Sequence, residues 1–241
     1  EEFWGQTGEF SAKTGCERIL SYMYMMIAKS RERNIKLTRE FLRSCGKNIQ
    51  YHPGVPTWFQ RINKYGSEHG VKVEHYLVSS GTKEILEGCS IYDCFTKAYG
   101  CEFYYENGIP VWPKLAINYT QKTQFFFRIA KGVTNIKDDD SVNKKTEGLR
   151  IPYSNIAYIG DGMTDVACMT LVNKNGGYSV GVYTDSNKES VAQIRKDKRC
   201  RFVVKADYSQ NSDMEKVFKL IIDDIANRTV LEEKEKALAN K

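Results

Sequence analysis

Short strand-like runs that alternate with helical stretches between residues 70 and 227 constrain the fold of this chain most strongly. Four runs are rich in β-branched and aromatic residues, and they cover residues 71–78, 155–159, 178–183 and 201–204. Residues 164–172 and 188–195 lie between later runs and have helical patterns. Strands separated by helices indicate a parallel sheet covered by helices on both faces. The sequence therefore predicts an α/β fold.

The first 68 residues have a different pattern, which predicts helices at 16–33, 39–45 and 56–66. Thr38 is a suitable N-cap for the second of them, and Met23, Met25 and Met26 are interpreted as core residues. We therefore expect a helical domain over 1–68, an α/β core over 69–228 and a charged tail over 229–241. Within the core, Asn107-Gly108 predicts a hairpin over 103–112.

Composition and charge exclude several classes of protein. The chain has 241 residues, of which 41% are hydrophobic and 27% charged, as in ordinary soluble domains. Its net charge of +6 comes from lysines and arginines interleaved with acids, so we expect no nucleic-acid partner. No apolar run approaches the roughly 20 residues that span a bilayer, so we expect no membrane partner. Seven scattered cysteines without a C-x-x-C pair favour a reducing, cytoplasmic location. The chain begins at Glu1-Glu2-Phe3-Trp4, so we expect it to start inside a longer protein.

The stretch from Gly160 to Asp165 carries the strongest chemical signal. Asp161 and Asp165 are two carboxylates four residues apart, where a predicted strand ends and a helix begins. Ligands of parallel sheets bind at the carboxyl ends of strands, and carboxylate oxygens suit Mg²⁺ bound together with a phosphate. Gly160 and Gly162 would let the backbone turn tightly around the ion. A plain glycine-containing loop is the alternative interpretation.

Two weaker signals accompany it. Ser80-Gly81 follows the predicted strand 71–78, and a hydroxyl with free amides there can hold a phosphoryl group. Lys122 lies near the start of an apolar helix, where a lysine is also typical of an ordinary surface residue. Lys131, followed by Gly132, is the competing lysine of this region.

In this order, Ser80, Lys122 and the pair Asp161 and Asp165 resemble the second, third and fourth motifs of the haloacid-dehalogenase-like hydrolases. The similarity is greatest to phosphatases of the phosphoserine phosphatase type, and His52-Pro-Gly-Val resembles that family's approach to its second motif. The resemblance implies a Rossmann-like core and identifies the helical segment 1–68 as a small cap domain.

The resemblance also implies a mechanism through an aspartyl phosphate. Asp161 would bind Mg²⁺, and Asp165 would hold the ion's water or neighbouring groups. Lys122 would neutralise negative charge, while Ser80 and the Gly81 amide would orient the phosphoryl oxygens. The family's first motif, Asp-x-Asp-x-Thr, supplies the nucleophile and the general acid, but the first aspartate of this sequence is Asp93.

The sequence thus predicts a Mg²⁺-dependent phosphatase of a small phosphorylated metabolite, with its nucleophile upstream of residue 1. Because no aspartate precedes Asp93, a non-catalytic binding module on the same fold is an alternative. A phosphotransferase or mutase of the same family is a further alternative.

Overall fold

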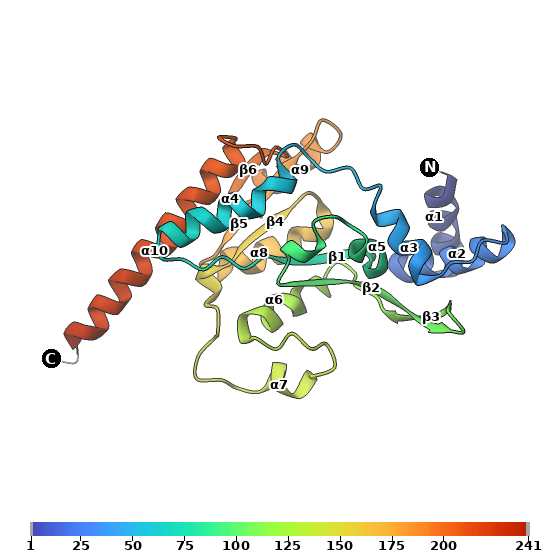
Figure 1. The fold of residues 1–241 in the computed structure, drawn as a ribbon, viewed down its shortest axis with the longest axis horizontal. Helices are drawn as coiled ribbons and strands as arrows, with labels where there is room; N and C mark the ends of the chain where they lie inside the picture. Colours follow the sequence, from blue (N-terminus) through green and yellow to red (C-terminus); the bar gives the residue numbers. More distant parts are fainter. Residues whose placement is uncertain (1, 240–241) are drawn as a thin grey trace. The chain divides into compact units, whose positions relative to one another are not determined.

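The computed structural model describes residues 2–239, which form two compact units (Figure 1). Unit 1 comprises Glu1–Gln50 and Tyr76–Asn118, and unit 2 comprises Tyr51–His75 and Tyr119–Lys241. Both units combine helices with a small sheet, so the chain has the predicted α/β character. The junctions between the units do not coincide with the predicted boundaries at 68/69 and 228/229.

Unit 1 is built on a mixed three-stranded sheet in the order β1-β2-β3 (Figure 1). Its strands are β1 (Tyr76–Thr82), β2 (Lys97–Glu106) and β3 (Ile109–Leu115), and its helices are α1 (Glu2–Thr14), α2 (Arg18–Glu32), α3 (Arg39–Gly46), α5 (Lys83–Glu87) and the 3₁₀ turn η1 (Tyr92–Cys94). Strands β1 and β2 are parallel, whereas β2 and β3 form the predicted antiparallel hairpin. Asn107 and Gly108 have φ values of 49° and 77°, which explains why this dipeptide makes the turn.

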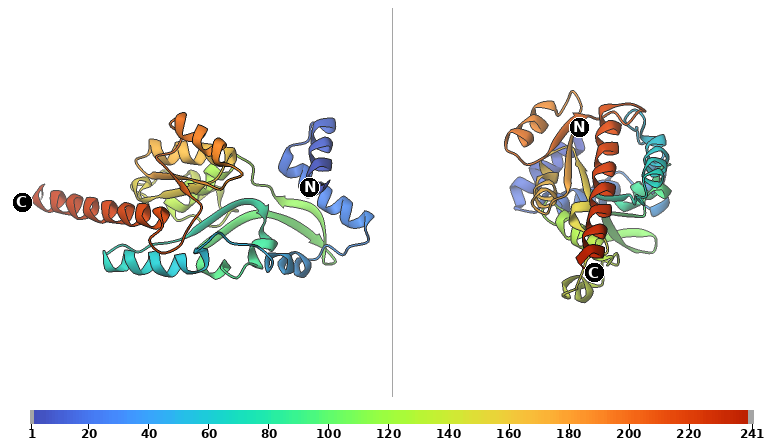
Figure 2. Two further views of the ribbon diagram at one scale, coloured as in Figure 1. Left: turned by 90° about the horizontal axis from the view of Figure 1, so that it is seen from above. Right: turned by 90° about the vertical axis from the view of Figure 1, so that its left-hand side faces the viewer.

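Unit 2 contains a parallel sheet in the order β4-β5-β6, which helices flank (Figure 2). The strands are β4 (Ala157–Gly160), β5 (Tyr178–Tyr183) and β6 (Phe202–Lys205). The helices are α4 (Val55–Glu68), α6 (Lys122–Lys131), α7 (Asp139–Asn143), α8 (Val166–Lys174), α9 (Lys188–Lys196) and α10 (Asp213–Ala239), with 3₁₀ turns η2 (Tyr153–Asn155) and η3 (Met163–Asp165). Because the three strands are parallel, their carboxyl ends lie at one edge of the sheet.

Most of the predicted elements of the second half are confirmed. Strand β5 has the predicted bounds, and β4 and β6 differ from theirs by one or two residues. The first predicted strand, 71–78, is wrong in position, because β1 begins at Tyr76 and continues to Thr82. Its start is set by pairing of Tyr76 with Lys97 in β2, which local sequence does not reveal. The Ser-Ser-Gly segment consequently lies within the strand rather than after it.

The predicted helices of the first 68 residues are also confirmed, as α2, α3 and α4. The Thr38 side chain caps α3 by accepting a hydrogen bond from the Phe41 amide at 3.1 Å. Met23 and Met25 are buried in the core of unit 1, as expected for the methionine cluster.

The predicted charged tail is part of α10, which continues through Ala239. Figure 2 shows this helix as the long red element at the end of the chain. Glu215 near its start is buried and accepts a hydrogen bond from Arg61 of α4 at 2.7 Å, which fastens the two helices together. Among the described residues 2–239, no helix is both long and apolar enough to cross a membrane.

Candidate functional site

The carboxylate of Asp165 is the centre of a hydrogen-bonded cluster at the carboxyl end of β4. Its Oδ1 atom accepts from the Lys122 ammonium at 2.8 Å and from the Tyr158 hydroxyl at 2.7 Å. Its Oδ2 atom accepts from the backbone amide of Asp161 at 3.1 Å. Asp165 is only 4% exposed, so these donors compensate for the loss of water around its charge. The structure thus brings together three of the predicted residues, Lys122, Asp161 and Asp165.

Lys122 is a buried residue, so the surface alternative for it is wrong. It is the first residue of α6 and is 7% exposed. A cation at a helix N-terminus interacts unfavourably with the helix dipole, and the ion pair with Asp165 offsets this cost. The competing Lys131 lies elsewhere, because its ammonium donates to the carbonyl oxygens of Val142 and Lys144 at 2.7 and 2.8 Å.

Tyr158 is a member of the cluster that the sequence does not predict. Burial, followed by the nearby charge of Asp165, raises the pKa of its hydroxyl above the ordinary range for tyrosine. The hydroxyl therefore remains protonated and donates to Asp165. The thiol of the fully buried Cys168 hydrogen-bonds to the same hydroxyl. A tyrosine within an otherwise apolar strand is the signal that could have identified it.

Asp161 is exposed at the end of β4, and its backbone is held on both sides. Its amide donates to Asp165, while its carbonyl oxygen accepts from the Asn187 side chain at 2.8 Å. The Asn187 Oδ1 atom in turn accepts from the Thr184 amide at 2.6 Å, so Asn187 links the ends of β4 and β5. No sequence pattern indicates this role, because asparagine before a helix is a common capping residue.

The surroundings of Asp161 suit a cation. Partial withdrawal of its carboxyl group from water, followed by repulsion from Asp165, raises the pKa of Asp161. A bound divalent cation would stabilise the ionised carboxylate in this position. Among residues 2–239, no group of three or more His, Cys, Asp or Glu side chains could hold a metal ion.

Asp165 fits direct metal ligation less well than Asp161 does. Its Oδ1 atom already accepts two hydrogen bonds and its Oδ2 atom accepts one, so most of its acceptor capacity is used within the cluster. The hydrogen bonds around Asp165 instead suit a carboxylate that holds neighbouring groups, which is one of the two tasks that the resemblance implies for it. Asp161 is therefore the carboxylate of this pair that is better placed to face an ion.

Ser80 and Gly81 belong to unit 1, whereas the Asp165 cluster belongs to unit 2. The Ser80 Oγ atom is buried without a hydrogen-bond partner among the described residues. Its carbonyl oxygen accepts from the Tyr22 hydroxyl at 2.6 Å. The Gly81 amide, which was predicted to donate to a phosphate, instead donates to the Ser79 Oγ atom at 3.0 Å. Ser80 thus retains an unused hydroxyl, while Gly81 would have to exchange partners to bind a phosphate.

The two glycines around Asp161 differ in what surrounds them, and the chain bends at Gly162. A Cβ atom on Gly160 would lie 2.5 Å from the Asp165 Cβ and 2.7 Å from its Cγ, so this glycine permits Asp165 to approach the strand. Gly162 has an extended φ of −168°, and a Cβ atom added to it would meet open space. Only Gly160 is therefore required by close packing.

We expect Gly160→Ala to destabilise the chain by about 1–3 kcal/mol, because Asp165 must move away from Lys122 and from the Asp161 amide. Gly162→Ala is the matched control and should unfold at nearly the wild-type urea concentration. Urea unfolding followed by circular dichroism measures both. Equal midpoints for the two variants would show that the close approach of Asp165 is unimportant.

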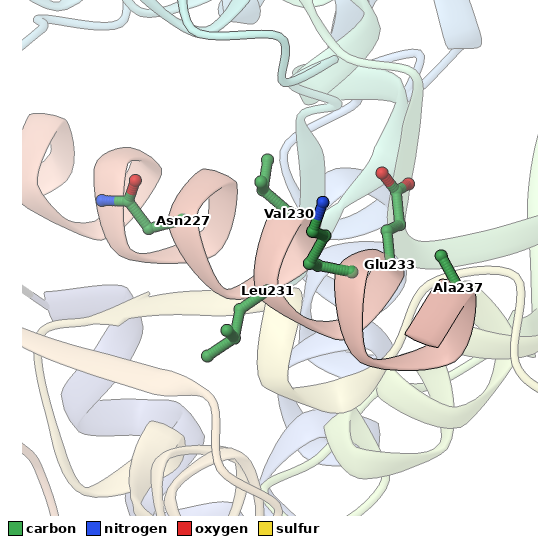
Figure 3. Close-up of a pocket in the computed structure, with 6 residues that line it drawn as sticks. Asn227, Val230, Leu231, Glu233 and Ala237 are labelled. Carbon is green, nitrogen blue, oxygen red and sulfur yellow. The ribbon is translucent and has the colours of Figure 1, made fainter. Parts of the chain in front are cut away.

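An open hollow runs along the exposed side of α10 and is separate from this cluster (Figure 3). Its lining comes from one helix: Asn227, Val230, Leu231, Glu233, Lys234 and Ala237. Figure 3 shows Val230 projecting from the same side of the helix as Glu233, while Leu231 projects from the other side. None of the sequence-predicted site residues lines it.

Comparison with known proteins identifies one similar protein without assigning an activity. An uncharacterized protein of Borreliella burgdorferi is 28% identical to this chain over 175 residues, which cover 64% of this chain and 60% of the relative. The chain therefore spans less than two thirds of that relative's length. No protein-family model matches the chain, and no solved structure matches it either.

Proposed function

We propose that this chain is the greater part of a Mg²⁺-dependent phosphatase that hydrolyses a small phosphorylated metabolite in the cytoplasm. The proposal includes the resemblance to haloacid-dehalogenase-like hydrolases, with a Rossmann-like core over 69–228 and a helical cap over 1–68. The nucleophilic aspartate would belong to a segment upstream of residue 1. Within the chain, no aspartate precedes Asp93.

The observation that carries the proposal is the buried contact between Lys122 and Asp165 beside Asp161. These residues are 43 positions apart, yet the Lys122 Nζ atom lies 2.8 Å from the Asp165 Oδ1 atom. The resemblance links these residues only by their order in the sequence. Their contact in space is a separate observation that supports a shared task. An ammonium group next to an exposed carboxylate suits a phosphate that is bound together with a metal ion.

Each residue has a defined task in the proposed reaction. The upstream aspartate attacks phosphorus, the phosphate ester bond breaks, and a second upstream carboxyl group protonates the leaving oxygen. Water then hydrolyses the acyl phosphate. Lys122 would neutralise charge on the transferring group, Asp161 would hold Mg²⁺, and Asp165 would keep Lys122 in place. The resemblance also gives Ser80 the task of orienting a phosphoryl oxygen, and its hydroxyl has no hydrogen-bond partner among the described residues.

The chemistry that Mg²⁺ supplies when bound is neutralisation of phosphate charge. The remaining groups act through the protein itself. Asn187 and Asp165 fix the backbone at Asp161 from opposite sides, so the Asp161 carboxylate needs little rearrangement to accept an ion. Preorganised charges of this kind are the main contribution that proteins make to phosphoryl transfer.

The test compares this chain with the extended protein, meaning the same chain together with the segment encoded upstream of Glu1. We expect the extended protein to hydrolyse p-nitrophenyl phosphate with Mg²⁺ and to lose this activity in EDTA. The 241-residue chain should be inactive under the same conditions. Turnover by the 241-residue chain that survives repurification would contradict an upstream nucleophile.

The non-catalytic alternative has its own supporting observation, the lack of aspartate among the first 92 residues. It makes the opposite prediction for the extended protein. Absence of an Asp-x-Asp-x-Thr segment upstream, together with no turnover of any phosphate monoester, would favour a binding module.

A further inference from the structure

We propose that Tyr158 is a positioning residue, which holds the Asp165 carboxylate so that Asp165 can direct the Lys122 ammonium toward the substrate. The catalytic consequence rests on the proposed function, whereas the positioning itself is a property of this chain. Tyr158 lies in β4, and its hydroxyl is 2.7 Å from the Asp165 Oδ1 atom.

Tyr158 is the side-chain donor to the Asp165 carboxylate that comes from a β-strand. Lys122 and Tyr158 donate to the same oxygen, but they come from different elements, α6 and β4. A lysine side chain has four rotatable bonds, while the tyrosine ring is fixed within the packed β4 strand. The ring also packs against the buried cluster of Met169, Ile194 and Cys200. Tyr158 therefore fixes Asp165, and Asp165 in turn fixes Lys122.

This arrangement matters most when Lys122 changes partner. An ammonium that contacts a transferring phosphoryl group gives up part of its interaction with Asp165. The Asp165 Oδ1 atom then keeps Tyr158 as its donor, so the buried carboxylate is not left with a single hydrogen bond to the Asp161 amide. Without the hydroxyl, movement of Lys122 toward the substrate would leave that oxygen unpaired, which is costly in a buried site.

Tyr158→Phe removes only the hydroxyl oxygen and leaves the ring in place. We expect kcat of the extended protein to fall about 10-fold with KM changed by less than about twofold, because the interaction is needed chiefly as the transition state forms. The second readout uses the 241-residue chain itself. The nitrogen-15 NMR signal of the Lys122 ammonium, identified by its loss in Lys122→Met, should broaden in Tyr158→Phe because the ammonium is held less firmly.

Tyr178→Phe is the matched control. Tyr178 is a buried tyrosine of the neighbouring strand β5 whose hydroxyl also donates to an aspartate, Asp224. The substitution removes the Tyr178 hydroxyl and so deletes a hydrogen bond of the same kind outside the Asp165 cluster. We expect Tyr178→Phe to leave both kcat and the Lys122 ammonium signal unchanged, even where it lowers stability.

The outcomes separate the two proposals. A broadened ammonium signal in Tyr158→Phe, with an inactive extended wild type, would support positioning and reject the phosphatase. An active wild type whose Tyr158→Phe variant keeps both its kcat and its ammonium signal would overturn the positioning of Asp165 by Tyr158. Equal losses in Tyr158→Phe and Tyr178→Phe would also overturn it, because the effect would then be one of general stability.

Discussion

Replacing Lys122 by methionine is expected to lower both the stability of the chain and the rate of the proposed reaction. The substitution leaves the Asp165 carboxylate buried without its cation, and breaking a buried ion pair from one side costs about 3–5 kcal/mol. Asp165 keeps its hydrogen bonds from Tyr158 and Asp161, so we expect a value of about 3 kcal/mol, near the lower limit of that range. Urea unfolding of the 241-residue chain measures this effect directly.

The same variant should lower kcat of the extended protein at least about 100-fold, because one preorganised charge is lost from the transition state. Lys131→Met is the control, since the Lys131 ammonium donates to backbone carbonyl groups of the following segment, away from Asp165. It should retain kcat. A Lys131→Met variant that loses turnover, combined with a normal Lys122→Met variant, would show that the wrong lysine was assigned to the phosphate.

Asp161→Asn is expected to abolish Mg²⁺-dependent turnover while changing stability by less than about 0.5 kcal/mol, because the side chain is exposed. The amide keeps the size of the carboxylate but removes the charge that a magnesium ion requires. Asparagine before Gly162 can deamidate back to aspartate, so Asp161→Ala serves as a second variant. Activity is measured across a series of Mg²⁺ concentrations.

Asp185→Asn is the matched control for this substitution. Asp185 is an exposed aspartate in the turn after β5, and its replacement removes one negative charge from the same edge of the sheet. We expect its Mg²⁺ dependence to match that of the wild type. Normal turnover by Asp161→Ala at modest Mg²⁺ would place the ion at other residues.

The sequence predicted the parts of the fold that depend on local patterns. The hairpin at Asn107-Gly108 was predictable because this dipeptide adopts the positive φ values of a tight turn. The start of β1 was not, because it depends on pairing between Tyr76 and Lys97. The division into two units was equally hidden, since unit 2 includes the segment 51–75 from the first half of the chain.

In the candidate site, too, only the features that depend on local sequence patterns could be predicted. Asp161 and Asp165 stand out because two carboxylates follow a strand, which is a local feature. The burial of Lys122 depends on Asp165, 43 residues later, and a lysine at the start of a helix gives no sign of it. Tyr158 and Asn187 belong to the cluster through hydrogen bonds to Asp165 and to the Asp161 backbone, and the sequence offered a signal only for Tyr158, a tyrosine within an otherwise apolar strand.

If the Lys122, Asp161 and Asp165 cluster serves an aspartyl-phosphate reaction, the extended protein must carry the phosphoryl group on an aspartate during turnover. The most direct measurement is mass spectrometry of the extended protein after acid quenching in the steady state. We predict a hydroxylamine-sensitive phosphoryl group on an aspartate upstream of Glu1, and its loss when that aspartate is replaced by asparagine. Steady turnover with the phosphoryl group on Ser80 or Asp161, or on no residue at all, would contradict the proposed mechanism.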